Sequence, residues 1–575
     1  MKKSLVLKRH VLATSALLSV FFGTHAFAAT VPDAATSTAG AGRVQEQFLD
    51  EAVSPALSPR VEVKDIILQQ LPPNAENIKF TLNSLEIEGL GVYKENDVAP
   101  LYQNKLGTTV SLADIYAVAT ALTNKYRNEG YILTQVVVPP QTIESGTVRL
   151  KVVEGFVDKV TVEGSDDESA MRLIRAYADN IRSDNALNVK QLEKFLLLIN
   201  DLPGIEARSI LSPSKTRAGA SDLRVIVERD PYDAILSLDN HGSRYLGPVQ
   251  LGAAGSLNSF FGNNERITAK LVVAPEFGGP YELAYGSLSY LQPVNTYGTT
   301  AEFFASHTDT EPGYNLDEFD VEGRSQYFRV TAEHPFIRTR SRNLYGHVAF
   351  DWRDVESKNN LEATRHDRIR ALRAGGRYEF LDTLLGAGLN SLELEASKGI
   401  NIFGASDEGD VNLSRSAGDP EFFKLNAEAQ RLQRITSEVN LLMAVRGQWA
   451  SDALLASEEF GVGGINYGRA YDPSEIVGDD GVAGKVEVQW NEPRKFDMFE
   501  DYQLYGFYDI GKVWNQDATT STNKKNSLAS TGVGIRADFA HDIEAGAAVA
   551  FPLTRDVETQ QDDDPRFYFN VSRRF

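Results

Sequence analysis

The chain has 575 residues, carries a formal net charge of −21 and contains no cysteine. This length predicts more than one domain. The acidic charge argues against binding to nucleic acid, whose phosphates attract basic proteins. The lack of cysteine excludes disulfides and thiolate chemistry.

The first 28 residues have the ordered features of a secretory signal peptide. A positive start (Lys2, Lys3, Lys8 and Arg9) precedes an apolar run from Val11 to Phe22 and the small-x-small cleavage site Ala26-Phe27-Ala28. An ordinary N-terminal helix is the alternative, but it would not need these features in this order. No later stretch reaches about 18 consecutive apolar residues, so we predict no transmembrane helix after cleavage.

Residues 29–76 are expected to form a lead and a linker. One short helix is predicted over 42–52, because Val44, Phe48 and Leu49 fall on one helical face. This helix is a candidate plug for a pore, and a disordered lead is the alternative. Proline then interrupts regular structure at Pro55, Pro59, Pro72 and Pro73.

An internal repeat of about 75 residues follows, and such periods indicate repeated modules. Leu85-Glu86-Ile87-Glu88-Gly89 and Val160-Thr161-Val162-Glu163-Gly164 both predict a strand that ends at glycine. A short polar helix and a longer helix come next in each repeat. The longer helices begin at the capping residues Ser111 (with Asp114) and Asn188. Two strands close each unit, at 131–138 with 147–153 and at 206–211 with 222–228. We therefore predict two β-α-α-β-β modules, over 77–154 and 155–230.

From about residue 231 the sequence alternates between apolar and polar residues, as strands do. In one run Leu344, Val348, Phe350 and Trp352 alternate with His347, Asp351 and Arg353. A soluble sandwich with one wet face and a membrane barrel with one lipid face both fit this pattern. The alternation alone leaves the two folds open.

The connections favour the barrel. We predict sixteen antiparallel strands over 231–575. Connections after even strands are mostly short: about 261–264, 293–296, 337–341, 381–384, 433–435 and 541–542. Connections after many odd strands are long and polar: about 309–324, 355–365, 400–420, 450–481, 515–527 and 554–564. The turn near 492–501 is a longer exception. Short periplasmic turns and long outer loops are typical of outer-membrane barrels.

The end of the chain supports the same fold. On the last predicted strand, one face carries Phe567, Phe569, Val571 and the C-terminal Phe575. An ordinary amphipathic edge strand is the alternative. Together with the signal peptide, the pattern favours a lipid-facing final strand and a barrel-assembly signal.

At this point the sequence resembles the transporter (TpsB) of a two-partner secretion system, in the haemolysin secretion/activation family. The two repeats resemble the POTRA modules of that family. The segment from Gly130-Tyr131-Ile132 through Pro139-Pro140-Gln141, followed by Gly146 to Gly155, is similar to its first module. The resemblance extends over about residues 42–575. It implies a location in the outer membrane, with the modules in the periplasm.

The most specific similarity lies after the eleventh predicted strand. Phe460-Gly461-Val462-Gly463-Gly464 leads to Gly468-Arg469-Ala470-Tyr471-Asp472-Pro473-Ser474-Glu475. In the family this is the sixth extracellular loop, which implies that residues 450–481 fold into the lumen. The usual core is Arg-Gly-aromatic, and here Ala470 replaces the glycine. Phe507-Tyr508-Asp509-Ile510-Gly511 resembles the barrel-wall motif of the family.

Alternation with period two assigns a direction to the wall motif. If Asp509 points inward, so do Tyr505, Phe507 and Gly511, whereas Leu504, Tyr508 and Ile510 point to lipid. A carboxylate that faced lipid at mid-depth would be costly. An inward Asp509 can bind Arg469, whose planar guanidinium suits a carboxylate. Two independent, solvated charges are the alternative.

The resemblance implies that the chain exports an unfolded exoprotein, such as an adhesin or a cytolysin. A general outer-membrane insertase or assembly factor is the alternative function, although such relatives typically carry three or five modules. Other expected partners are the barrel-assembly machinery and periplasmic chaperones during biogenesis, and outer-membrane lipid. We expect a monomer without cofactor or metal.

A candidate docking site for the exoprotein lies in the first module. An exposed sheet edge binds an extended chain through the main chain with little sequence demand. In this fold the middle strand of each module is usually the edge. The stretch Leu133–Val138, with Leu133, Gln135 and Val137, is therefore expected to dock the cargo together with helix 112–128. The alternative is that these residues only pack the core of the module.

Two other function classes fit less well. The histidines that follow the signal peptide are scattered, without metal-binding or nucleophile–base spacing, and Gly484-Lys485 and Gly511-Lys512 are each followed by valine rather than completing a phosphate loop. We therefore predict no enzyme. A passive pore would need neither the two soluble modules nor the loop around Arg469.

Overall fold

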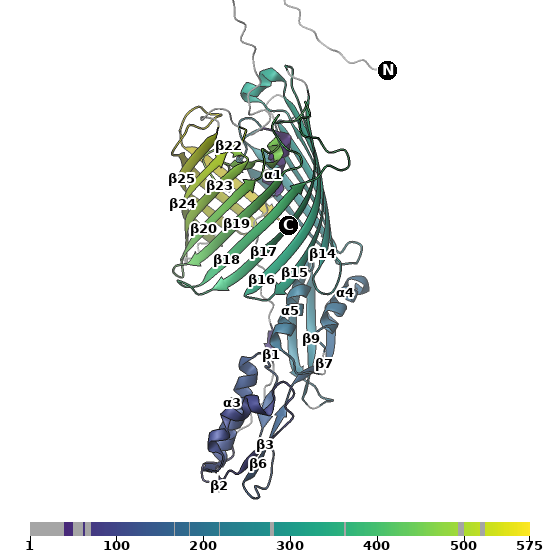
Figure 1. Ribbon diagram of the computed structural model, residues 1–575, viewed down its shortest axis with the longest axis vertical. Helices are drawn as coiled ribbons and strands as arrows, with labels where there is room; N and C mark the ends of the chain where they lie inside the picture. Colours follow the sequence, from purple (N-terminus) through teal and green to yellow (C-terminus); the bar gives the residue numbers. More distant parts are fainter. Residues whose placement is uncertain are drawn as a thin grey trace, which may run out of the picture.

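The computed structural model describes residues 39–49, 61–63 and 71–575, except 166, 183–184, 218, 276–280, 362–363, 493–499 and 518–523. The expected signal peptide and the end of the expected plug helix, residues 50–52, lie outside the described residues. A barrel lies at one end and two α/β modules extend from it in line (Figure 1). Within the described ranges, no helix is long and apolar enough to span a membrane.

The first module has the predicted β-α-α-β-β order. Its sheet has the order β3 (Ser84–Glu88), β6 (Thr147–Val153) and β5 (Gln135–Val137), and β2 (Lys79–Thr81) pairs separately with β4 (Thr109–Ser111). The helices are α2 (Glu95–Val98), two 3₁₀ turns (Ala99–Leu101 and Gln103–Lys105) and α3 (Leu112–Asn128). The predicted capping box is present, because Ser111 Oγ accepts from Asp114 N and the Asp114 carboxylate accepts from Ser111 N. Ile115, Leu122 and Tyr126 of α3 are buried against the sheet.

The second module contains β7 (Phe156–Glu163), α4 (Glu168–Asp179), α5 (Val189–Asn200), β8 (Ile205–Pro213) and β9 (Ala220–Arg229). Its first helix is longer than the short polar helix that was predicted, because Met171, Ile174 and Tyr177 extend its buried face. The sheet has the order β1-β8-β9-β7. Strand β1 (Val61–Val63) belongs to the linker and pairs in parallel with Ser209–Leu211 of β8. The linker of the chain therefore covers the edge strand of its own second module.

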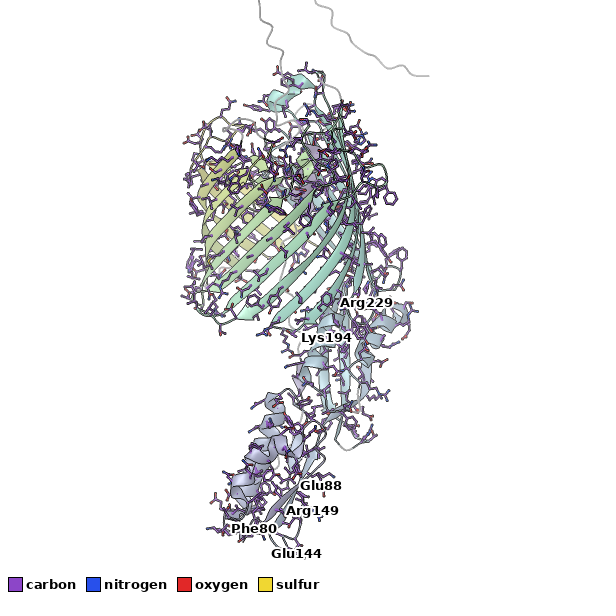
Figure 2. All side chains as sticks on the ribbon, viewed as in Figure 1. Phe80, Glu88, Glu144, Arg149, Lys194 and Arg229 are labelled. Atoms are coloured by element: carbon purple, nitrogen blue, oxygen red, sulfur yellow. The ribbon has the colours of Figure 1, made fainter. Side chains whose placement is uncertain are left out.

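Contacts fix the second module to the periplasmic turns of the barrel. Arg338, at the end of β15, donates to both carboxylate oxygens of Asp201, at 2.8 and 2.6 Å. The Tyr177 hydroxyl donates to Asn295 O at 2.8 Å, and burial raises its pKa to about 12, so it remains a protonated donor. Figure 2 places Lys194 and Arg229 of this module near the barrel, and Phe80 and Glu144 at the far end of the first module.

The barrel closes with sixteen antiparallel strands, as predicted, and β10 pairs with β27. The strands are β10 (Tyr232–Asp239), β11 (Gln250–Asn258), β12 (Arg266–Ala274), β13 (Leu283–Pro293), β14 (Thr300–Thr310), β15 (Glu322–Arg338), β16 (Arg342–Lys358), β17 (Arg365–Asp382), β18 (Gly388–Gly399), β19 (Phe423–Arg434), β20 (Val439–Ala450), β23 (Asp480–Asn491), β24 (Asp501–Trp514), β25 (Lys525–Phe539), β26 (Ile543–Pro552) and β27 (Arg566–Arg574).

The turns on the module side are short, such as 339–341 and 540–542, and the loops at the opposite end include 400–422, 451–479 and 553–565. One long loop also contains a 3₁₀ helix, Tyr314–Phe319. The predicted alternation of turn and loop lengths is confirmed. The lipid face of the last strand is also as predicted, with Phe567 60% and Phe575 55% exposed.

Helix α1 (Ala41–Leu49) lies against the inside of the barrel wall, beside β14, β15 and β16 (Figure 1). The Ser325 hydroxyl of β15 donates to Gln45 Oε1 at 2.7 Å, and the ring of Phe48 lies 4.8 Å from that of Tyr285. The structure thus has a lumenal helix within the stretch where the sequence predicts a plug.

Candidate functional site

The loop between β20 and β23 (residues 451–479, the inward-folding loop) crosses the lumen. It contains the 3₁₀ turn Ala456–Glu458 and a small hairpin of β21 (Phe460–Val462) with β22 (Ile476–Gly478). Val462, Ala470, Tyr471 and Asp479 are all 2% exposed or less. This burial places the loop within the barrel rather than outside it.

The tip of the loop binds the wall motif through Arg469 and Asp509, a pair that we call the lock. Arg469 Nε donates to Asp509 Oδ2 at 2.9 Å, and Nη2 donates to Oδ1 at 2.7 Å. The backbone N–H groups of Gly468 and Arg469 also donate to Oδ2, at 3.2 and 3.0 Å. Asp509 is fully buried, so these four donors satisfy a carboxylate that has no access to water.

The wall around the lock has the predicted orientation. Phe507 is 4% exposed and faces inward, whereas Tyr508 and Ile510 are 45% and 51% exposed on the lipid side. The guanidinium carbon of Arg469 lies 3.6 Å from the centre of the Phe507 ring, a cation–π contact. Gly511 leaves room for the loop, because a Cβ there would lie 2.4 Å from Val462 Cγ1.

Glu487 is a further member of the lock that sequence reasoning missed. Its carboxylate accepts from Arg469 Nη1 at 2.5 Å and from Arg536 Nη1 at 2.8 Å. Glu487 pairs in register with Phe507, so both side chains point into the lumen. The alternation Val486-Glu487-Val488 was the signal that could have placed this carboxylate inside.

The other loop residues of the motif bind the last strands. The Tyr471 hydroxyl lies 3.2 Å from Ala529 O and 3.3 Å from Arg555 O, and its one hydrogen is shared between these two acceptors. Asp472 accepts from Arg566 Nη1 of β27 at 2.8 Å and from the Thr559 hydroxyl. The tip therefore contacts both the wall motif and the strands that close the barrel.

A second, unpredicted anchor holds the start of the loop to another part of the wall, β16, β17 and β19. Glu458 is 1% exposed and accepts from Arg373 Nη2 at 2.9 Å. Lys424 Nζ lies 2.7 Å and Arg353 Nη1 3.7 Å from the same carboxylate. Three basic residues from β16, β17 and β19 thus surround one acidic residue of the loop. Removal of either partner would leave a buried charge unpaired, which is strongly destabilising.

Helix α1 rests on this anchored segment. Arg43 Nη1 donates to Glu459 O at 2.5 Å, and Nη2 donates to Ala456 O at 2.7 Å. Glu46 Oε1 accepts from Arg353 Nη1 at 3.2 Å. The helix and the loop therefore share partners and occupy the lumen together.

The structure corrects part of the candidate docking site. Strand β5 spans Gln135–Val137 only, and Leu133 lies outside it, packed against the core of the second module. Val136 N donates to Thr123 Oγ1 at 3.1 Å, on the side away from β6. Because successive N–H groups alternate in direction, those of Gln135 and Val137 point to β6. The edge of β5 that remains for another strand is therefore short.

The backbone at Ala470 explains why the family has glycine at this position. Ala470 has a φ of +97°, a region that favours glycine, and its methyl group is buried beside Phe507 and Tyr568. Replacement by glycine relieves strain of about 1–3 kcal/mol but removes one buried carbon, worth about 0.8 kcal/mol.

We therefore expect Ala470→Gly to leave the loop in place and Ala470→Val to release its tip, because a β-branched residue is poorly tolerated at positive φ. Hydrogen–deuterium exchange of residues 463–475 measures the release, with Ala427→Val on the exposed face of β19 as the control. Equal protection in Ala470→Val and the parent chain would contradict this account.

Comparison with known proteins identifies the family. Residues 219–537 match the family described as haemolysin secretion/activation protein ShlB/FhaC/HecB, and residues 80–155 match the POTRA domain of ShlB type. The heme/hemopexin transporter protein HuxB of Haemophilus influenzae (strain 86-028NP) is 23% identical over 508 residues, which cover 87% of this chain and 88% of HuxB. The outer membrane transporter CdiB of Dickeya dadantii (strain 3937) is 20% identical, over 84% of this chain and 86% of CdiB.

A solved structure supports the fold. CdiB from Escherichia coli aligns with a TM-score of 0.72 at 19% identity, over 89% of this chain and 93% of that one. It shares the POTRA modules and the sixteen-stranded barrel. The match over the barrel and the first module shows that this chain belongs to the haemolysin secretion/activation family of outer-membrane transporters.

Proposed function

We propose that the chain recognises one unfolded exoprotein in the periplasm and secretes it through the barrel to the cell surface. The observation that carries the proposal is the lock, in which the loop motif around Arg469 binds the wall motif at Asp509. The lock fixes the loop that carries the family motif inside the lumen, where the exoprotein would pass. The proposal includes no catalytic step, because passage of an extended chain needs binding and a path.

A general insertase is the alternative. The two α/β modules favour secretion, since the insertase relatives typically carry three or five. We further propose that the chain acts as a monomer, and that the barrel-assembly machinery and periplasmic chaperones assist its insertion. The exposed Phe567, Val571 and Phe575 of the last strand support this route, with Phe569 on the same face.

The resting pore is proposed to be closed by α1 and the inward-folding loop. The contacts of α1 are of a kind that allows the helix to leave the lumen. Gln45 and Arg43 bind hydroxyl and carbonyl groups, and Glu46 contributes an ion pair with Arg353. Neutral hydrogen bonds contribute about 0.5–1.5 kcal/mol each and those of a charged group such as Arg43 about 1.5–3 kcal/mol, so a cargo that offers equivalent bonds can replace them.

Cargo docking is proposed at the first module, at the β5 edge with Gln135 and Val137. Two observations support this choice. Strand β1 already covers the corresponding edge of the second module. Among the described strands, β5 has one neighbour, β6, and its outward N–H group, that of Val136, donates to Thr123 Oγ1, so a cargo strand must displace this one contact to pair here. Leu133 would contribute indirectly, by holding the two modules together.

The first prediction concerns the lock. We expect Arg469→Ala to insert as a folded barrel but to secrete poorly, because it leaves the buried Asp509 without its cation. Loss of one partner of a buried pair costs about 3–5 kcal/mol, which is enough to displace the loop tip while the strand ladder persists. Secretion of the partner exoprotein, measured against the transporter level in outer membranes, tests this.

Two comparisons sharpen the experiment. Asp509→Ala should resemble Arg469→Ala, and the double variant should be little worse than either, because partners in one contact are not additive. Arg377→Ala is the matched control, since it removes a barrel-wall arginine whose ion pair is with Glu379 on its own strand rather than with the loop or the lock. If the two losses multiply while both barrels insert normally, the residues act separately and the lock is wrong.

The second prediction concerns the plug. Arg43→Ala should open the channel more often in planar bilayers, because it removes the bonds from α1 to Ala456 and Glu459. Deletion of residues 30–54 should give a larger, permanent increase in conductance. Lys358→Ala, which breaks an exposed ion pair with Glu322, should behave like the parent. Unchanged conductance of the deletion variant would reject the plug.

The third prediction concerns docking. A photo-crosslinking residue at Gln135 should capture the N-terminal domain of the exoprotein. The same residue at Glu86, on the opposite edge strand β3, should capture much less. Equal capture at both positions, or capture only at Glu86, would place the dock elsewhere on the module.

A further inference from the structure

The lipid-facing wall of the barrel carries a groove with a volume of about 400 Å³. This volume lies in the range of small-ligand sites, roughly 300–1,000 Å³. Its apolar walls include Leu392, Val445, Val486, Tyr508 and Ile510, which are 43–51% exposed. The small residues Ala429 and Gly484 form the floor of the groove. A side chain at Gly484 would fit without a clash, because its Cβ would lie 3.5 Å from its nearest neighbour, the carbonyl oxygen of Ala444.

The strand register gives the direction of the groove. Its lining follows one row of paired residues, Phe380, Asn390, Arg431, Met443, Val486 and Tyr508. Phe380 is two residues from the periplasmic end of β17, whereas Tyr508 is seven residues from that end of β24. The groove therefore begins at the periplasmic surface of the membrane and rises toward the middle of the hydrocarbon layer.

Charged side chains are gathered at the periplasmic mouth of the groove. Arg431 Nη1 donates to Asp382 Oδ2 at 2.7 Å and Nη2 to Oδ1 at 3.0 Å, and Asn390 contacts both residues. Asn390 is two residues from Leu392 on β18, and Arg431 is two residues from Ala429 on β19. Because side chains alternate between the two faces of a strand, Asn390 and Arg431 also face the lipid. Charges on this face are costly at mid-depth, by about 2–4 kcal/mol, but are tolerated near the interface. Their depth is thus that of lipid headgroups.

Arg342 adds a free positive charge at the same mouth. It is exposed on β16, pairs in register with Phe380 and, among the described residues, has no side-chain partner. Asp382 is two residues from Phe380 on the same face, so it lies diagonally next to Arg342. The mouth thus offers one unpaired guanidinium beside a carboxylate that an arginine holds in place.

We propose that this groove binds one phospholipid of the periplasmic leaflet through its phosphate. The phosphate meets Arg342, and one acyl chain lies in the groove along Val486 and Tyr508. The Asp382 carboxylate is already bound by Arg431, Asn390 and Leu384 N, so the mouth keeps one unpaired positive charge for the phosphate. The apolar groove, which begins at headgroup level and ends in the hydrocarbon, matches the amphipathic form of the lipid.

Native mass spectrometry of the detergent-solubilised full chain tests the proposal, with dioleoylphosphatidylethanolamine as the probe. The parent should retain one such lipid at collision energies that remove the others. Gly484→Leu fills the groove and should lose this lipid. Gly506→Leu is the matched control, because Gly506 faces lipid on β24 outside the groove and a Cβ there would find its nearest neighbour, Gly532 O, at 3.8 Å. All variants are first checked for the compact migration of a folded barrel.

A second set of variants tests the headgroup. Arg342→Gln should weaken retention by about tenfold, the effect of losing one charge-assisted hydrogen bond. Arg574→Gln, at the periplasmic end of β27, should have no effect. Equal retention by Gly484→Leu and the parent would overturn the site. So would equal retention by Arg342→Gln and the parent, since this would show that the phosphate is not bound at the mouth.

Discussion

The buried carboxylate of Asp509 is the constraint on which the lumen of this barrel depends. A carboxylate without water needs donors, and four of them come from the tip of one loop. The wall motif is therefore satisfied only while residues 463–475 are inside the barrel. Glu458 repeats the arrangement with the charges exchanged, since here the loop supplies the carboxylate and the wall supplies Arg373 and Lys424.

These two anchors differ from the contacts of the plug helix. The loop is held at its start and at its tip by buried ionic contacts, and losing one partner of such a contact is costly. The helix relies more on carbonyl and hydroxyl partners, several of which belong to the loop itself. In the proposed mechanism the loop is the fixed surface and the helix is the part that leaves. The route for cargo would then open along β14–β16 without loss of the lock on β24.

The sequence alone was sufficient to predict features that depend on a short repeating pattern along the chain. Alternation placed Phe507 and Asp509 inside and Tyr508 outside, and the turn and loop lengths gave the topology of the barrel. The lock followed from two motifs together with that alternation. Sequence reasoning missed the Glu458 anchor, the Arg338–Asp201 contact and the pairing of β1 with β8, because each joins segments that are distant in the chain and carry no common pattern. It also extended β5 to Leu133, whose apolar side chain packs on the neighbouring module.

The contacts between the modules and the barrel have a mechanical consequence. Arg338 and Tyr177 attach the second module to the barrel turns. Leu133 packs on the second module, and across the joint between the modules Val189 N donates to Gly130 O and Asn188 Nδ2 donates to Glu129 O. The periplasmic part is therefore a spacer of set length rather than a flexible tether. If the exoprotein docks at the first module, as proposed, it must keep a matching stretch of extended chain between the segment that is bound and the segment that enters the pore first.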